Sequence, residues 1–253
     1  GQFSNTLNVF YDDIESRDHN VLHLSKGGKI EYEKLVLATG SRAIEPPIDG
    51  IQRDGVILIN QDPEQIRKIK TEALDAESVV IYGGGYLGVE LCDELLRAGK
   101  QVTIIEKSKR LMPSSFDADT SNKVKEVIEN LGGKVILDVK IKSVLGIDAV
   151  TGVKLSSDEI IDCDFLMICR GSRPNVEMAE KLGIIFDRDR GILVDEYFRT
   201  SDKSIYAVGD CAAKHDFFAS DLSNVLNYTS KMEEAKLLGA NLYPVIFNRG
   251  KMI

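Results

Sequence analysis

Apolar positions along the chain follow two periods, which predict alternating strands and helices. Residues 79–82 (VVIY) form a continuous apolar run and predict a buried strand. From Tyr86 to Ala98 the apolar residues recur at helical spacing, and Gly99 ends the pattern. A second strand is predicted from Gln101 to Ile105. Strand, helix and strand together make a βαβ unit of about 30 residues.

Similar patterns on both sides of this unit predict further elements. Upstream they predict strands at 21–24, 29–32 and 35–38 and a helix from Asp62 to Leu74. Downstream they predict a helix from Asp117 to Leu131, a β-meander with strands at 139–144 and 153–155, strands at 165–169, 192–194 and 205–208, and a last helix from Ser223 to Leu242. Strands that alternate with helices indicate an α/β fold with a parallel sheet.

A glycine-rich turn, Gly83-Gly84-Gly85-Tyr86-Leu87-Gly88, joins the strand at 79–82 to the following helix. In this GxGxxG pattern Gly83 permits a tight turn, Gly85 lets the backbone approach a pyrophosphate, and Gly88 lets the helix pack closely on the strand. The helix N-terminus offers unpaired N–H groups and a positive dipole end to phosphates. Glycine-rich turns are common, but this one has a strand before it, a helix after it and an acidic residue at the end of the next strand. The sequence therefore predicts a dinucleotide-binding site.

The acidic residue, Glu106, bears on the choice of cofactor. It lies 18 residues beyond Gly88, where a carboxylate accepts hydrogen bonds from the adenosine ribose. A carboxylate there repels the 2′-phosphate of NADP(H), so we expect NAD(H) to bind more tightly. Lys107, Lys109 and Arg110 follow directly and would offset part of this repulsion.

Two flanking segments distinguish the chain from methyltransferases that bind S-adenosylmethionine, which share the glycine pattern and the acid. Residues 32–41 (YEKLVLATGS) precede the turn, and residues 200–210 (TSDKSIYAVGD) follow it. The order of these three motifs resembles the pyridine nucleotide–disulfide oxidoreductase family over nearly the whole chain. Within that family the chain looks most like the branch of NADH oxidases, coenzyme A–disulfide reductases and ferredoxin or rubredoxin reductases.

The resemblance implies a flavoprotein with two dinucleotide-binding domains, in which a Rossmann-like NAD(H) domain is inserted into a partial FAD domain. We accordingly expect residues 1–45 and 166–253 to belong to the FAD domain and residues 46–165 to form the NAD(H) domain. Thr39-Gly40 would end the segment where the chain leaves the FAD domain. Gly171-Ser172-Arg173-Pro174 would be the segment where it returns.

The resemblance also implies roles for single residues. Asp210 matches an aspartate that hydrogen-bonds the ribityl chain of FAD, and Gly209 allows close approach. Tyr86 matches a tyrosine that covers the flavin in some members until the nicotinamide displaces it; the alternative is an aromatic cap on the first helical turn. Glu90 matches a glutamate near the nicotinamide and, four residues after Tyr86, shares its helix face. The alternative for Glu90 is a solvated helix position.

Two elements of the family are absent from this sequence. No first GxGxxG stands near the N-terminus to hold the ADP half of FAD, and the C-terminal interface domain is missing. The redox cysteine of the oxidase and disulfide-reductase branches would lie in the missing N-terminal part. We therefore expect the 253-residue chain to retain FAD poorly by itself. The resemblance allows a homodimer for the full-length protein.

Composition and charge narrow the class of protein further. The net charge of -8 argues against a nucleic-acid partner, and no run approaches the roughly 20 apolar residues of a membrane span. Neither CxxC nor zinc-ligand spacing occurs, so we expect buried, reduced thiols in a reducing compartment, the cytoplasm. The thiols are Cys92, Cys163, Cys169 and Cys211. The three histidines show no metal-ligand spacing, and no metal site is predicted.

We therefore expect an NADH-dependent FAD oxidoreductase. It would pass a hydride from nicotinamide to flavin and electrons on to an acceptor that the sequence does not name. The alternative is an NADH-binding module without turnover, resembling apoptosis-inducing factor, in which bound NADH changes the protein's interactions. Flavin occupancy and NADH consumption separate these two, whereas the fold does not.

Overall fold

Two compact units make up the chain, one of residues 43–172 and one of residues 1–42 together with 173–253. The computed structural model describes residues 7–59, 67, 69, 71–73, 75–216, 221–223 and 228–242. The chain crosses from one unit to the other twice. The two crossing segments, β5 (Ser41–Ala43) and β14 (Ser172–Pro174), pair as a two-stranded sheet.

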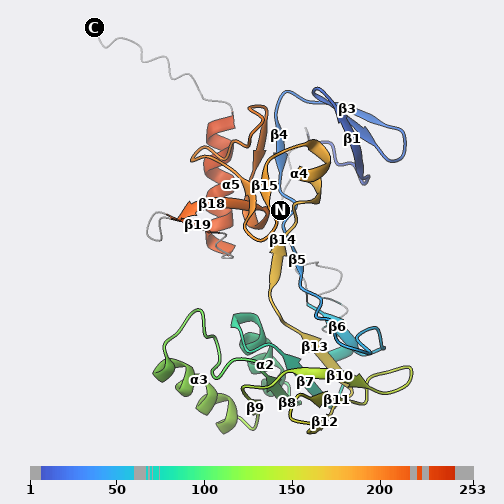
Figure 1. Cartoon of the computed structure of the whole chain (residues 1–253), viewed down its shortest axis with the longest axis vertical. Coiled ribbons are helices and arrows are strands. Elements are labelled where there is room, and N and C mark those ends of the chain that lie inside the picture. Colours follow the sequence, from blue (N-terminus) through green and yellow to red (C-terminus); the bar gives the residue numbers. More distant parts are fainter. Residues whose placement is uncertain are drawn as a thin grey trace. The chain divides into compact units, whose positions relative to one another are not determined.

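The centre of the unit 43–172 is a parallel sheet of five strands in the order β6-β13-β7-β8-β9 (Figure 1). Its strands are β6 (Val56–Leu58), β7 (Ser78–Tyr82), β8 (Gln101–Ile105), β9 (Lys134–Ile136) and β13 (Phe165–Ile168). The α/β class and the parallel sheet that the sequence predicts are confirmed.

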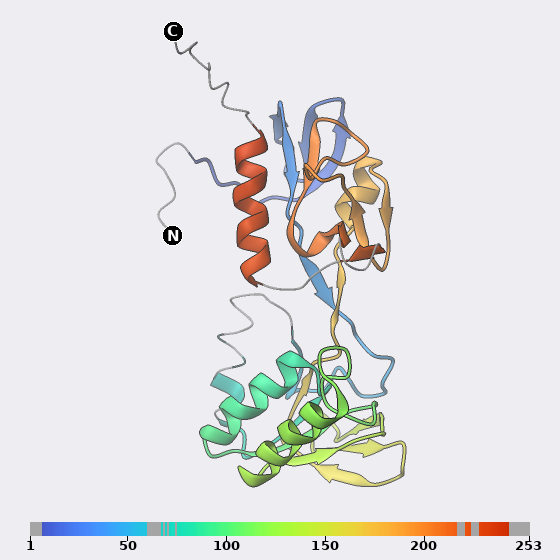
Figure 2. The same ribbon diagram turned by 90° about the vertical axis from the view of Figure 1, so that its left-hand side faces the viewer.

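The two faces of this sheet are covered by different elements (Figure 2). Helices α2 (Tyr86–Arg97) and α3 (Ala118–Asn130) pack on one face. On the other lies an antiparallel sheet of β10 (Ile141–Leu145), β11 (Gly152–Leu155) and β12 (Ile160–Asp162). Because successive side chains of a strand point to opposite faces, Ile81 meets the helices whereas Tyr82 meets the antiparallel sheet.

Local signals in the sequence set the ends of the two helices. Asp117 caps α3, since its Oδ1 accepts a hydrogen bond of 2.8 Å from the N–H of Thr120, and this bond lowers the pKa of Asp117. Helix α2 ends at Arg97, and Gly99 follows with φ of 79°. Both helices thus lie where their periodicity and caps predict them.

The second unit is built around two parallel strands, β4 (Leu35–Leu37) and β17 (Ile205–Ala207). Leu37, Ile205 and Ala207 pack in one apolar cluster, while Tyr206 and Val208 pack with Leu238 of helix α5 in another. Its other elements are β1 (Ile14–Asp18), β2 (Val21–Leu24), β3 (Lys29–Glu31), α4 (Glu177–Leu182), β15 (Phe186–Asp187), β16 (Gly191–Leu193), the 3-10 turn η1 (Gly209–Cys211), β18 (Ala212–Asp216), β19 (Asp221–Ser223) and α5 (Tyr228–Leu242).

Some predicted element limits differ from the structure. Ser223 was predicted to begin the last helix but lies in strand β19, because residues 221–223 pair with β18, and α5 begins at Tyr228. The meander has a third strand, β12, which the periodicity did not indicate. The described residues of segment 67–75 are helical, and the predicted start of that helix at Asp62 lies outside the described residues.

The predicted domain boundary at 165/166 would pass through β13. That strand pairs with β7 along its whole length and with β6 from Leu166 to Ile168, and the compact unit extends to Ser172. The assignment of either unit to a cofactor stays a prediction. No helix in the described ranges is long and apolar enough to cross a membrane.

Candidate functional site

The glycine-rich turn connects the end of β7 to the start of α2 and has the close contacts that glycine permits. Gly83 has φ of 122°, and a Cβ there would lie 2.2 Å from the carbonyl oxygen of Cys169. A Cβ at Gly88 would lie 1.9 Å from the carbonyl oxygen of Gly83, so only glycine lets α2 pack this near the turn. A Cβ at Gly85 would meet no atom within 4 Å. The backbone at Gly85 is therefore open to a ligand.

The N-terminus of α2 has no side chain that satisfies its first N–H groups. Gly85 occupies the cap position without a side-chain hydrogen bond, and the first turn contains no acidic residue. The first N–H groups of a helix have no partner inside the helix and carry the positive end of its dipole. This end of α2 can therefore bind an anion.

Glu106 follows the last residue of β8 and is nearly buried, with 7% of its surface exposed. Its Oε2 accepts a hydrogen bond of 2.7 Å from the N–H of Gly84, and its Oε1 accepts one of 2.8 Å from the N–H of Ser108. A carboxylate oxygen can accept a second hydrogen bond, so both oxygens keep acceptor capacity. The carboxylate is thus fixed against the glycine turn. The sequence predicted its place at the strand end but not its bond to Gly84.

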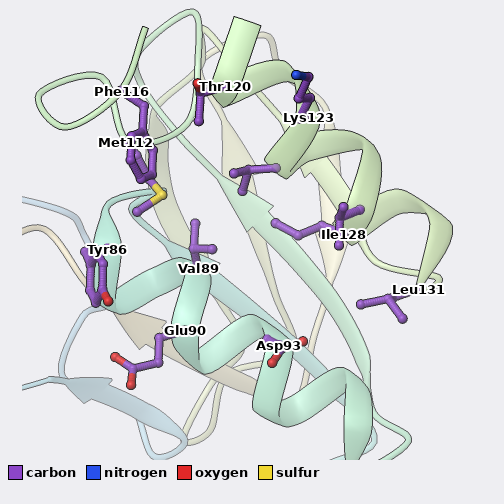
Figure 3. A pocket seen from close by; sticks show the side chains of 12 residues that line it. Tyr86, Val89, Glu90, Asp93, Met112, Phe116, Thr120, Lys123, Ile128 and Leu131 are labelled. Atoms are coloured by element: carbon purple, nitrogen blue, oxygen red, sulfur yellow. The ribbon is translucent and has the colours of Figure 1, made fainter. Parts of the chain in front are cut away.

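Tyr86 and Glu90 lie at one end of a groove between α2 and α3, and Leu131 lies at the other (Figure 3). The groove has a volume of about 510 Å³. Tyr86 is 71% exposed, and Leu87 beside it is 42% exposed. The groove is lined by Tyr86, Val89, Glu90, Asp93, Met112, Phe116, Thr120, Lys123, Val124, Val127, Ile128 and Leu131. Tyr86 and Glu90 share one helix face, as their spacing predicts.

In the other unit, the carboxyl ends of β4 and β17 lie side by side because the two strands are parallel. Thr39 and Gly40 follow β4, while Gly209 and Asp210 follow β17. Thr39 donates its hydroxyl to the carbonyl oxygen of Asn175 at 2.6 Å. The structure therefore brings together these four residues, which the sequence singles out at distant positions.

Asp210 is 4% exposed and keeps one unsatisfied oxygen. Its Oδ2 accepts hydrogen bonds from Lys231 Nζ at 2.7 Å and from Ser41 Oγ at 3.2 Å. Its Oδ1 has no partner among the described residues. A buried acceptor without a partner is costly, so a donor from a ligand would stabilise it. Gly209, with φ of 78°, has no atom within 4 Å of the position a Cβ would take.

Glu234 of α5 fixes the backbone next to Asp210. Its carboxylate accepts hydrogen bonds from the N–H of Gly209 at 3.1 Å and from Lys214 Nζ at 2.8 Å. Sequence reasoning missed Glu234, Lys214 and Lys231, since no motif contains them. Lys231 is 21 residues from Asp210 in sequence, and Lys214 is 20 residues from Glu234, so no local pattern indicates that these pairs meet.

Gly171, the remaining predicted site residue, has φ of 84°, and its carbonyl oxygen accepts a hydrogen bond from the N–H of Ile44. The division between the units falls between Ser172 and Arg173, inside the segment that was predicted to return the chain to the FAD domain.

All four cysteines are free thiols; Cys92, Cys163 and Cys211 are buried, as predicted, whereas Cys169 is half-buried. Burial raises the pKa of Cys92, Cys163 and Cys169 to about 12, so these three are protonated at neutral pH. The described part of the chain contains no group of three or more metal-ligating side chains.

Comparison with known proteins agrees with this geometry. Residues 3–235 match the family model described as pyridine nucleotide-disulphide oxidoreductase. The chain belongs to this family. Among curated members, the nitric oxide reductase FlRd-NAD(+) reductases of Salmonella paratyphi A and Escherichia coli O6:K15:H31 are 33% and 32% identical over 218 residues. Each alignment covers 84% of this chain and 56% of the relative.

Solved structures of family members show the same fold. The ferredoxin reductase for the CYP199A2 system from Rhodopseudomonas palustris is 28% identical with a TM-score of 0.84, covering 92% of this chain and 58% of that one. The NAD-dependent persulfide reductase from A. fulgidus is 27% identical with a TM-score of 0.86, covering 92% and 43%. The chain thus spans about half the length of the relatives it matches.

Proposed function

We propose that the protein is an NADH-dependent FAD oxidoreductase, in which the unit 43–172 binds NADH and the other unit contributes to FAD binding. The observation that carries this proposal is the buried Glu106 carboxylate, held against the N–H of Gly84 at the phosphate-binding turn. The uncapped N-terminus of α2 at this turn is an anion site for the diphosphate, and the fixed carboxylate beside it is an acceptor for the ribose.

The surroundings of Glu106 favour NADH over NADPH. A 2′-phosphate would place negative charge beside a buried carboxylate. Lys107 and Lys109 are exposed, and Arg110 donates to the carbonyl oxygen of Pro113 at 3.1 Å. Exposed lysines are screened by solvent, so they offset only part of the repulsion. Two ribose hydroxyls, by contrast, would use the acceptor capacity that Glu106 retains.

Residues of the other unit fit FAD. The unpartnered Oδ1 of Asp210 would accept a hydrogen bond from a ribityl hydroxyl, and the open backbone at Gly40 and Gly209 would admit the ligand. When bound, FAD accepts a hydride and releases electrons to an acceptor. Asp210 would hold and orient the cofactor, and its bonds to Lys231 and Ser41 would keep the carboxylate in place.

For the acceptor we propose a small electron-carrier protein. The names of several similar proteins state a protein as the substrate, among them the FlRd-NAD(+) reductases and the ferredoxin reductase.

The proposal is tested by anaerobic titration of the flavin-loaded full-length protein with NADH, followed by the visible absorbance of the flavin. Stoichiometric bleaching by NADH, with far less bleaching by NADPH at equal concentration, is the expected result. NADH binding without bleaching would instead identify a non-turnover module. Equal bleaching by both nucleotides would contradict the role given to Glu106.

A variant at Glu106 links this result to the carboxylate. Glu106→Arg should lower NADH affinity by roughly tenfold to a hundredfold, because a charge-assisted hydrogen bond contributes about 1.5–3 kcal/mol. The same variant should bind NADPH more tightly than the parent does. Glu126→Arg makes the same change of charge at an exposed position of α3 and should leave both affinities unchanged. Isothermal calorimetry measures all four constants.

A further inference from the structure

We propose that Arg170 binds the phosphate on the nicotinamide side of the dinucleotide's diphosphate group. This inference rests on the proposed NADH binding by the unit 43–172 and adds a residue that lies in no part of the glycine pattern.

The position of Arg170 follows from strand pairing. Strand β13 runs parallel to β7, with Ile168 opposite Tyr82, and the N–H of Cys169 donates to the carbonyl oxygen of Tyr82 at 2.8 Å. Arg170 therefore leaves the sheet beside the first glycine of the turn. A Cβ at Gly83 would lie 3.5 Å from the backbone nitrogen of Arg170.

The order of the strands makes this edge of the sheet a ligand crevice. From β7 the chain passes through α2 to β8 on one side, whereas β13 and β6 lie on the other side of β7. In open α/β sheets, ligands bind outside the carboxyl ends of the strands at the point where the strand order reverses. Arg170 follows β13 at this point.

The guanidinium of Arg170 is held by a buried tyrosine. Its Nη1 donates to the hydroxyl of Tyr82 at 2.9 Å, and its Cζ lies 5.0 Å from the centre of the Tyr82 ring. Tyr82 is 2% exposed and belongs to the apolar cluster between the two sheets, so it is a fixed support. An arginine held in this way loses less entropy when it binds a planar or tetrahedral anion.

No carboxylate within the described residues pairs with Arg170. Six other arginines do form ion pairs with carboxylates: Arg17, Arg42, Arg97, Arg173, Arg188 and Arg199. Arginine has five N–H donors, and one of those of Arg170 is used by Tyr82. The rest suit the forked bonds that a phosphate accepts.

The choice of phosphate follows from the places of Glu106 and Arg170 on the sheet. Glu106 follows β8 on the side proposed for the adenosine, the N-terminus of α2 follows the turn after β7, and Arg170 follows β13 on the opposite side. A dinucleotide laid across this edge from β8 to β13 brings its second phosphate toward Arg170. AMP, which has only the first phosphate, would not use Arg170.

Binding of NADH, ADP-ribose and AMP to the parent and to Arg170→Gln tests the proposal. The dissociation constants of NADH and ADP-ribose should rise about tenfold to a hundredfold, and that of AMP should not change. The dissociation constants of Arg170→Lys for NADH and ADP-ribose should lie between those of the parent and those of Arg170→Gln, because lysine keeps the charge but not the forked donor geometry. Arg97→Gln removes the same charge at the far end of α2 and should bind all three ligands as the parent does.

Other outcomes overturn the inference or the proposed function separately. If Arg170→Gln weakens the binding of AMP as much as that of ADP-ribose, or weakens the binding of neither, then Arg170 only packs on Tyr82 and the inference is wrong. If Arg170→Gln fails to fold, Arg170→Lys and Tyr82→Phe decide. If both variants bind ADP-ribose with unchanged affinity, the inference is overturned. If they bind ADP-ribose more weakly and AMP with unchanged affinity, the inference is supported. If the parent binds neither NADH nor ADP-ribose, the proposed function itself fails.

Discussion

At the scale of residues, two buried carboxylates lie at the two places where we propose that a cofactor binds. Glu106 and Asp210 each follow a parallel strand and each lie next to a glycine of a turn. Burying an ionised carboxylate is costly unless it has partners. Glu106 has two backbone N–H groups, and Asp210 has Lys231 and Ser41 on one oxygen only. The partners fix both side chains and leave acceptor capacity for a ligand.

Glu90 and Tyr86 give a prediction about rate at this scale. If Glu90 orients the nicotinamide ring, Glu90→Ala in the flavin-loaded full-length protein should slow flavin reduction more than it weakens NADH binding. A misplacement of the reacting ring by about 1 Å can cost on the order of a hundredfold in rate. If Tyr86 covers the flavin, Tyr86→Ala should speed the reaction of reduced flavin with oxygen. Rapid mixing with NADH and with oxygen measures both.

Glu94→Ala is the matched control for Glu90→Ala. Glu94 lies one helical turn further along α2, is exposed, and lies outside the groove. The flavin of Glu94→Ala should be reduced by NADH at the parent rate. If the flavin reacts with NADH and with oxygen at the parent rates in all three variants, Tyr86 and Glu90 are ordinary helix positions without a role in the reaction.

At the scale of elements, short strands are fixed by polar contacts between segments distant in sequence. Asp202, just before β17, accepts hydrogen bonds from Arg17 of β1 at 2.6 Å and from the hydroxyl and N–H of Ser204 at 2.7 and 2.9 Å. These bonds from Ser204 and Arg17 lower the pKa of Asp202 to about 2. The contact ties the first hairpin to the strand that leads to Asp210.

The lowered pKa gives Asp202 a defined effect on acid stability. Because the folded-state pKa lies below the ordinary value of 3.8, the stabilisation is complete above that value and is lost as the pH falls to about 2. At neutral pH the free energy of unfolding of Asp202→Asn should therefore be lower than that of the parent by about 1 kcal/mol. Denaturant unfolding at several pH values measures the difference. A gap between parent and variant that persists at the acid end would contradict this assignment.

At the scale of the whole molecule, each unit has its own apolar cores. Among the described residues, two of the four buried clusters contain only residues of 43–172, and the other two contain only residues of the second unit. In the first unit one core lies between the sheet and the helices and one between the two sheets. A unit with complete cores has what independent folding requires.

Residues 43–172 should therefore fold and bind NADH when expressed alone. The affinity of this unit for NADH should match that of the whole chain, because Glu106, Arg170 and the glycine turn all lie within the unit. Circular dichroism and calorimetry test the two parts of this expectation. Cooperative unfolding without NADH binding would mean that the other unit completes the nucleotide site.

The sequence alone determined the βαβ unit, the glycine turn, the strand-end acid and the family. These are local features: apolar period, helix caps and a backbone turn that only glycine tolerates act over a few residues. Only the tertiary structure decided the contacts of Glu106 with Gly84, of Arg170 with Tyr82 and of Lys231 with Asp210. It also decided β12, β15, β18 and β19, because a strand this short is stabilised by the partner that pairs with it. The pairing with a neighbouring strand, and not the residue pattern of the segment itself, therefore decides whether so short a segment is a strand.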